Sequence, residues 1–163
     1  MSEIHRFMSS FRYGFRPHAF KTEILGVSNK LEFMCMSSNV PGREIGTIEV
    51  PVGNMQVPIP GDPPAVEWTT NCMLDTDFSI YDDVENWFDM IHHPETLIGA
   101  DLSILLRTAN IILLDNNHKE IKEYQLLNLW PKTLGELEIS KESRDEIARF
   151  DVTWAFSTRL RVR

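Results

Sequence analysis

The segment IEVPVGNMQVPIP, residues 48–60, decides the fold of this chain because it joins a tight turn to two runs of alternating apolar residues. With Gly53 and Asn54 as the turn residues of a type II′ turn, the flanking strands pair so that six apolar side chains share one face. These side chains are Ile48, Val50, Val52, Met55, Val57 and Ile59. The other face carries Pro51 and Pro58, which cannot donate to a strand ladder. We therefore expect the hairpin at residues 45–60 to lie at a sheet edge or to project from the sheet.

The apolar face of this hairpin needs a cover, and two arrangements fit the sequence. The hairpin either folds over its own core or contacts another subunit, since an exposed apolar strip of this kind usually marks an interface. The six apolar side chains are therefore candidate subunit-interface residues.

Alternation continues outside the hairpin and predicts a mainly β fold. Residues 19–25 and 30–36 alternate around Ser28-Asn29, which predicts a first hairpin. Residues 66–74 resume the alternation after a proline-rich break.

The second half of the chain shows the same pattern. Residues 110–115 and 118–124 flank Asn116-Asn117 and predict a second tight hairpin. Ile111 to Leu114 is apolar on both faces, which indicates burial on two sides. Residues 135–140 and 146–156 predict two closing strands, separated from the preceding one by Trp130-Pro131.

One helix is predicted, at residues 79–93. Its apolar side chains recur with helical spacing at Ile80, Val84, Trp87, Phe88 and Ile91. Ser79 and Asp82 resemble a capping box at its start, and Pro94 ends it. A single amphipathic helix beside several strands is expected to lie against one sheet face.

No catalytic, metal-binding or phosphate-binding motif is present. Cys35 and Cys72 fall at alternating strand positions, so we interpret them as small buried apolar residues. His92 and His93 are adjacent on a helix and point about 100° apart, which prevents them from sharing one ion. We therefore expect no cofactor, no metal and no enzymatic activity.

Two further side-chain sets have ordinary structural explanations. The helix carboxylates form a solvated polar face, and the tryptophans belong in the core because no basic residues lie among them. The carboxylates are Asp82, Asp83, Glu85 and Asp89, and the tryptophans are Trp68, Trp87, Trp130 and Trp154.

Composition indicates one globular domain with short arms. The chain has 163 residues, of which 42% are hydrophobic and 25% charged. No apolar run is long enough to span a membrane, and the first ten residues lack a secretory core, so we expect a cytosolic protein. The formal net charge of −8 argues against a groove that grips nucleic acid.

The order of these segments resembles the tail tube proteins of contractile-tailed bacteriophages of the T-even type, whose relatives form the tubes of phage-derived contractile injection systems. The resemblance covers about residues 13–157. It rests on FRPHAFKTEIL, LEFMCMSSNVPGREIGTIEVPVGNM, AVEWTTNCMLDTDFSIYDDVENWF, LLNLWPKTLGELEIS and EIARFDVTWAF in this order and spacing.

This resemblance implies a structural virion protein. It implies an antiparallel β-sandwich or barrel flanked by one α-helix, in which six copies form a ring and join their strands into one inner β-barrel. The alternating strand at residues 146–156 would then pair within its own sheet on one edge and leave the other edge for the neighbouring subunit. Rings would stack into a hollow tail tube that carries DNA during ejection without sequence-specific binding. Its implied partners are further copies, a sheath protein, a tape-measure protein, and baseplate and tail terminator proteins. Assembly would take place in the host cytoplasm, without a membrane.

The resemblance also divides the chain into an arm at 1–17, a tube domain at 18–157 and a basic tail at 158–163. The tail departs from the family pattern, and its candidate contacts to the sheath or a neighbouring copy are Arg159, Arg161 and Arg163. Six copies at −8 each give a formal −48 per ring, which would repel DNA phosphates wherever that charge faces the bore.

Two alternatives remain open. The chain forms the tube of an extracellular injection device or initiates a tube at a baseplate, or it is a monomeric β-barrel that binds a small molecule. Genomic neighbours separate the first from a phage tail, and a single 19 kDa species at every concentration would indicate the second.

Overall fold

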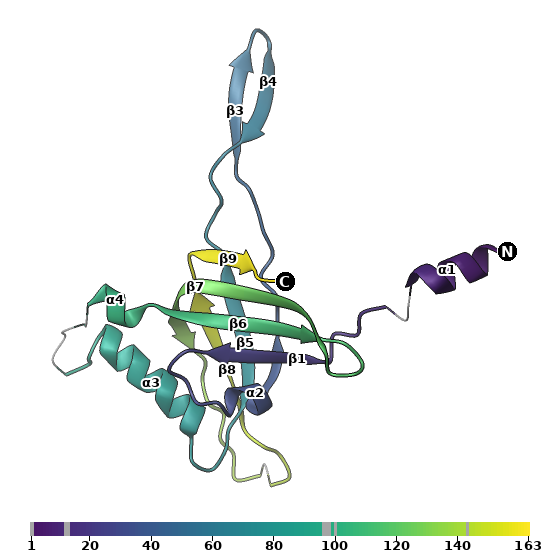
Figure 1. The fold of residues 1–163 in the computed structure, drawn as a ribbon. Helices are drawn as coiled ribbons and strands as arrows, with labels where there is room; N and C mark the ends of the chain where they lie inside the picture. Colours follow the sequence, from purple (N-terminus) through teal and green to yellow (C-terminus); the bar gives the residue numbers. More distant parts are fainter. Residues whose placement is uncertain (1, 12–13, 96–98, 100, 143) are drawn as a thin grey trace.

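Seven strands form one antiparallel sheet that bends into two layers (Figure 1). The strand order is β1-β6-β7-β8-β5-β2, and β9 also pairs with β7. In this computed structural model the described residues are 2–11, 14–95, 99, 101–142 and 144–163. Residues 1, 12 and 13 of the expected N-terminal arm therefore lie outside the described residues.

The two layers share the long strand β7, Glu120–Leu134. Layer A consists of β1 (Phe20–Ile24), β6 (Arg107–Leu114), β9 (Thr158–Arg161) and residues 120–129 of β7. Layer B consists of β2 (Cys35–Ser38), β5 (Glu67–Met73), β8 (Arg149–Ala155) and residues 130–134 of β7. In Figure 1 the strands of layer A run across those of layer B. The predicted mainly β fold is confirmed, and the sheet does not close within one chain.

Strand β7 passes from one layer to the other at Asn128. This residue has a φ of 57°, in the left-handed region that asparagine tolerates better than most residues. Its side-chain Nδ2 donates to Ser157 Oγ at 2.7 Å, between β8 and β9. The bend and the following strands are thereby joined at one point.

The core between the layers is built around three tryptophans, each at most 1% exposed. Trp154 lies 6.0 Å from Trp68 and 5.5 Å from Trp87, measured between ring centroids. The indole of Trp154 donates to Thr70 Oγ1 and that of Trp87 to the Leu105 carbonyl, so burial leaves neither N–H unpaired. The prediction of buried tryptophans is confirmed for these three. It is wrong for Trp130, which is 38% exposed because β7 turns that side chain outward beside the buried Leu129.

Helix α3, Ser79–Ile91, covers this core with Ile80, Val84 and Trp87, which confirms the predicted flanking helix. Its start differs from the prediction, because Ser79 does not cap it. Instead Asp75 accepts hydrogen bonds from the Ser79 backbone N–H and hydroxyl, at 3.1 and 2.9 Å. Three shorter helices were not predicted: α1 (Glu3–Phe11), α2 (Leu31–Met34) and α4 (Leu102–Leu105).

The predicted first hairpin is wrong. Strand β1 pairs with β6, and β2 pairs with β5 in the other layer. Between them the chain turns at Gly26, whose φ is 82°, and then forms the helical turn α2. Leu31 is buried and Phe33 is 74% exposed, whereas a strand would have placed both on one face. A four-residue alternation fits a helical turn as well as a strand, and the long-range partners decide between them.

The second predicted hairpin is confirmed as β6–β7, with the Asp115 carboxylate accepting N–H groups of Asn117 and Lys119 at 2.8 Å. The predicted closing strand is confirmed as β8. The predicted strand at 135–140 is absent, because β7 continues through Trp130-Pro131 as far as Leu134.

The two cysteines face each other across β2 and β5 in register. Both are free thiols and both are buried, which confirms their interpretation as small core residues. The hydrogen bond with Cys35, and then burial, raises the pKa of the Cys72 thiol.

Candidate functional site

The hairpin of β3 (Thr47–Val52) and β4 (Met55–Pro60) has the register that the sequence predicts. Ile48 pairs with Ile59, Val50 with Val57, and Val52 with Met55. Gly53 has a φ of 60°, as the first central residue of a type II′ turn requires. The six apolar side chains therefore share one face.

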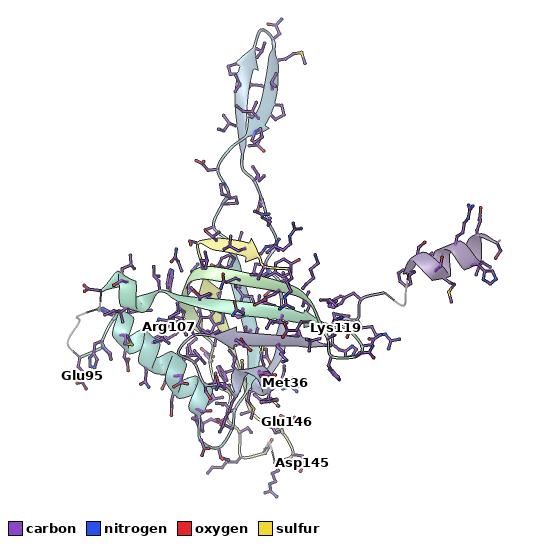
Figure 2. The ribbon with its side chains drawn as sticks, in the orientation of Figure 1. Met36, Glu95, Arg107, Lys119, Asp145 and Glu146 are labelled. Carbon is purple, nitrogen blue, oxygen red and sulfur yellow. The ribbon has the colours of Figure 1, made fainter. Side chains whose placement is uncertain are left out.

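This hairpin projects from the body and does not cover its own core (Figures 1 and 2). Every residue of β4 is exposed, and Val52 and Met55 at the tip are 59% and 71% exposed. At the base, Gly46 and Asp62 hold the two connections together through the Gly46 N–H and the Asp62 carbonyl, at 2.9 Å. A Cβ on Gly46 would meet that oxygen at 2.5 Å, so the base requires glycine. An apolar strip is thus held away from the body in a defined position.

Layer A ends in two open edges. Among the described residues, β1 pairs with β6 alone and β9 pairs with β7 alone. Each pairing in the layer is antiparallel, so β1 and β9 run in opposite directions at opposite margins. Unpaired strand edges of this kind bind other strands readily.

The outer face of layer A, which faces away from the core, combines polar side chains with a small apolar cluster of Ala19, Ile112 and Leu114. Glu23, Asn110 and Gln125 form one row across β1, β6 and β7. Glu123 lies in the next row, opposite Ile112. On the core side of the same strands lie Thr22, Ile111 and other buried residues.

The structure places the C-terminal arginines in or beside β9. Arg159 donates to the Pro41 carbonyl at 2.6 Å and lies over the Tyr124 ring, 4.7 Å from its centroid. Arg163 contacts Glu120 and Glu123 at 3.3 and 3.9 Å. Arg161 is exposed opposite Tyr124 in the ladder. Two of the three arginines thus contact their own chain, and the predicted contact to a sheath or neighbour stays a prediction.

The described part of the chain contains no group of three His, Cys, Asp or Glu side chains placed to hold a metal. None of its described helices is long and apolar enough to cross a membrane. The chemical character of the site is therefore that of an interaction surface, made of two open edges and one apolar hairpin. From the family resemblance, the closing strand at residues 146–156 was expected to leave one edge open for a neighbouring subunit. That expectation is wrong for this strand, because β8 is paired on both sides, with β5 and β7. The open edges lie on β1 and β9, since alternation does not record which strand margin stays unpaired.

Comparison with known proteins agrees with this description. Residues 4–160 match the family model described as phage tail tube protein. The chain is 25% identical over 142 residues to tail tube protein gp19 of Enterobacteria phage T4, covering 86% of this chain and 87% of that protein. It is 27% identical over 118 residues to the tail tube protein of Serratia phage KSP90, covering 72% of this chain and 67% of that protein.

Solved structures share the fold at lower identity. The sheath-tube complex of the extracellular contractile injection system PVC in the extended state matches with a TM-score of 0.71 and 14% identity, over 99% of this chain and 98% of that one. The tube-terminating cap of the anti-feeding prophage matches with a TM-score of 0.70 and 16% identity, over 91% and 90%. Since the family model spans nearly the whole chain, this chain belongs to the phage tail tube protein family.

Proposed function

We propose that six copies of this chain form a ring and that stacked rings form the rigid inner tube of a contractile tail. The observation that carries the proposal is the pair of open edges at the two margins of layer A. Because directions alternate across the layer, β9 of one copy meets β1 of an identically oriented neighbour as an antiparallel pair. Repetition around a ring closes layer A into a barrel and removes both of its exposed edges.

The projecting hairpin serves contacts between copies in this proposal. Five of its six apolar side chains are exposed in a single chain and Val50 is half-buried, and an exposed apolar strip on a rigid support is typical of an interface. Since the hairpin extends far beyond both layers in Figure 1, it reaches a neighbouring copy more readily than its own core.

The outer face of layer A lines the bore in this arrangement, because the core and helix α3 occupy the other face. The carboxylates of Glu23 and Glu123 lie on that outer face. The carboxylate of Glu23 would repel the phosphates of a DNA duplex and let it slide without sequence-specific binding, whereas the charge of Glu123 is partly balanced by Arg163.

The remaining features of the proposal concern location and partners. The tube lies in the virion tail, assembles in the host cytoplasm and has no catalytic activity. A sheath protein surrounds it, a tape-measure protein occupies it during assembly, and baseplate and terminator proteins bind its ends. Structures that share the fold include a sheath-tube complex, a terminator and a baseplate, which supports the sheath, terminator and baseplate proteins as partners. The exposed Arg161 is the C-terminal arginine best placed for a contact with the sheath or a neighbour.

Negative-stain electron microscopy of the purified protein, with sedimentation velocity across a concentration series, tests the proposal. Rings of six-fold symmetry or hollow rods are expected. A single 18.9 kDa species at every concentration would contradict the proposal and favour a monomeric ligand-binding barrel.

A second candidate is the tube of an extracellular contractile injection device, or a tube initiator at a baseplate. The fold shared with the PVC sheath-tube complex favours it. Such a tube would carry a protein effector, so co-purification of DNA or of a protein cargo with native particles distinguishes the two candidates.

A further inference from the structure

Helix α1 presents an apolar face that no described part of its own chain covers. Ile4, Phe7, Met8 and Phe11 recur with helical spacing, and they are 72%, 59%, 63% and 55% exposed. No residue of the helix is buried. In Figure 1 the helix stands beyond the start of β1, away from both layers.

The end of α1 has a defined geometry. Gly14 adopts a φ of 66°, and its N–H donates to the Phe11 carbonyl at 3.1 Å. The Phe7 and Phe11 rings stack at 5.1 Å between centroids. A nine-residue helix is nevertheless only marginally stable in water, so its formation requires a surface against which the apolar face is buried.

The distribution of charge indicates which surface covers the apolar face of α1. Residues 1–17 contain Arg6, Arg12 and Arg16 against one acid, Glu3, a formal charge of +2. The other residues of a chain with a net charge of −8 therefore carry −10. A basic arm on an acidic body is complementary to the body of another copy, which lies close by in any assembly of this chain.

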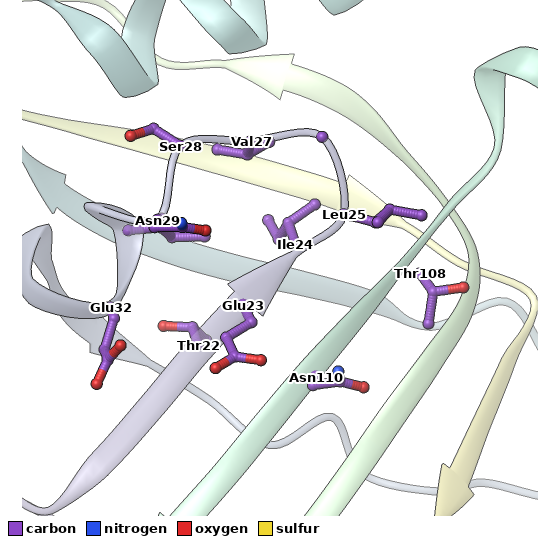
Figure 3. A pocket seen from close by; sticks show the side chains of 12 residues that line it. Thr22, Glu23, Ile24, Leu25, Val27, Ser28, Asn29, Glu32, Thr108 and Asn110 are labelled. Carbon is purple, nitrogen blue, oxygen red and sulfur yellow. The ribbon is translucent and has the colours of Figure 1, made fainter.

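The body offers a matching surface at the end of β1 (Figure 3). A pocket of about 530 Å³ lies there, lined by Thr22, Leu25, Val27, Glu32 and Asn110 among others. Leu25 at its rim is 71% exposed, and Phe33 in the adjoining α2 is 74% exposed. Glu32 supplies negative charge, and Thr22 Oγ1 and Asn110 Oδ1 are buried without a hydrogen-bond partner in the described structure. The pocket thus combines exposed apolar surface with an acidic group, which suits a basic, amphipathic helix.

We propose that α1 of one copy docks its apolar face into the pocket beside Leu25 of a second copy. Strand β1 carries the chain from the arm to the pocket, so the helix would have to run back along β1 to reach its own pocket. The eight residues between α1 and β1 span at most about 28 Å, a reach that covers the length of β1 as well as a gap to an adjacent copy, so a cross-linking experiment must distinguish the two. The choice of a second copy as partner rests on the proposed function. Residues of β1 line part of the pocket, so the arm would contact the second copy beside its β1 edge.

Cross-linking between two singly substituted proteins tests the proposal. One protein carries Met8→Cys and the other Leu25→Cys, and they are mixed before mild oxidation. A disulfide-linked dimer of the two different chains is expected on a non-reducing gel. His5→Cys on the polar face of α1 is the matched control, and at most a trace of dimer is expected with it. Cys35 and Cys72 are buried and should not compete.

Two outcomes would overturn the proposal. A disulfide that forms within the Met8→Cys, Leu25→Cys double variant but never between the mixed single variants would show that the arm folds onto its own body. No disulfide in either experiment would exclude contact between α1 and this pocket. If the disulfide forms between the two chains in particles that never form rings, the arm contact is supported and the proposed function is contradicted. A failure of the arm proposal can therefore be told apart from a failure of the proposed function.

Substitution of the apolar face gives an independent measurement. Phe7→Ser with Phe11→Ser is expected to raise the protein concentration needed for assembly by about tenfold or more, because two aromatic contacts are lost. His5→Ala with Ser9→Ala, on the polar face, should leave that concentration unchanged. Equal assembly by both double variants would contradict the proposal. Binding of the intact protein to anionic vesicles would also contradict it, if the phenylalanine double variant alone loses that binding.

Discussion

Replacing Val50 and Val57 together by aspartate tests the role of the hairpin. The two valines face each other directly across β3 and β4, and Val57 is 39% exposed. In a free chain the change removes an apolar cross-strand pair worth about 0.2–1 kcal/mol and places two like charges opposite each other. The core residues of the two layers do not include this hairpin, so the body should stay folded.

The double substitution should weaken the contact between subunits much more than it weakens folding. At a buried interface, the loss of each valine weakens association by about 1.5 kcal/mol of transfer free energy. Each buried carboxylate without a partner weakens it by about 2 kcal/mol or more, because the charge is desolvated. The sum, about 7 kcal/mol per subunit, corresponds to roughly a 10⁵-fold weaker contact. Assembly should therefore disappear at every accessible protein concentration.

The assay compares folding and assembly in the same samples. Tryptophan fluorescence reports on the body, because all four tryptophans lie outside the hairpin. Pelleting and negative-stain microscopy report on rods. Thr47→Asp with Gln56→Asp adds the same charges to the other face of the hairpin and should still assemble. Normal rods from the valine double variant, with a normal melting temperature, would refute the assignment of this face as an interface.

Three further predictions concern the fold. Asn128→Ala should destabilise the protein by about 1 kcal/mol more than Asn128→Gly in chemical denaturation, because both lose the bond to Ser157 but only alanine is strained at a φ of 57°; equal losses would exclude strain at this bend. The Lys30 hydrogen bond, followed by those from Ser79, lowers the pKa of Asp75, so its stabilisation is present above the unfolded-state pKa and is lost as pH falls through the folded-state pKa. The melting temperatures of wild type and Asp75→Asn should accordingly differ at about pH 6 and converge below about pH 3, and a constant gap would contradict this role. Cys35 and Cys72 should react with Ellman's reagent only after unfolding, and rapid labelling of the native protein would show that the pair is accessible.

Local signals predicted local structure well. The Gly53-Asn54 turn determined the register of the projecting hairpin, and the 3.6-residue period located α3, because each depends on residues close together in the chain. Partners distant in the sequence were not predictable in this way. The pairing of β1 with β6 brings Thr22 opposite Ile111, and no pattern within either segment records that choice.

The difference between local patterns and long-range pairing also explains which parts of the candidate site could be predicted from the sequence. The six apolar side chains of the hairpin could be named from alternation alone. The exposure of five of them agrees with the prolines on the opposite face, which place the hairpin outside the sheet. The open edges of β1 and β9 depend on the order of strands in the whole sheet. The capping role of Asp75 and the outward position of Trp130 likewise depend on where the neighbouring segments fold.

A helical reconstruction of the assembled protein by cryo-electron microscopy tests the central claim most directly. The account predicts six copies per ring, with β9 of each copy hydrogen-bonded antiparallel to β1 of the next in one closed barrel. Assemblies in which these two edges remain unpaired, or purified protein that stays monomeric at the highest attainable concentration, would contradict it.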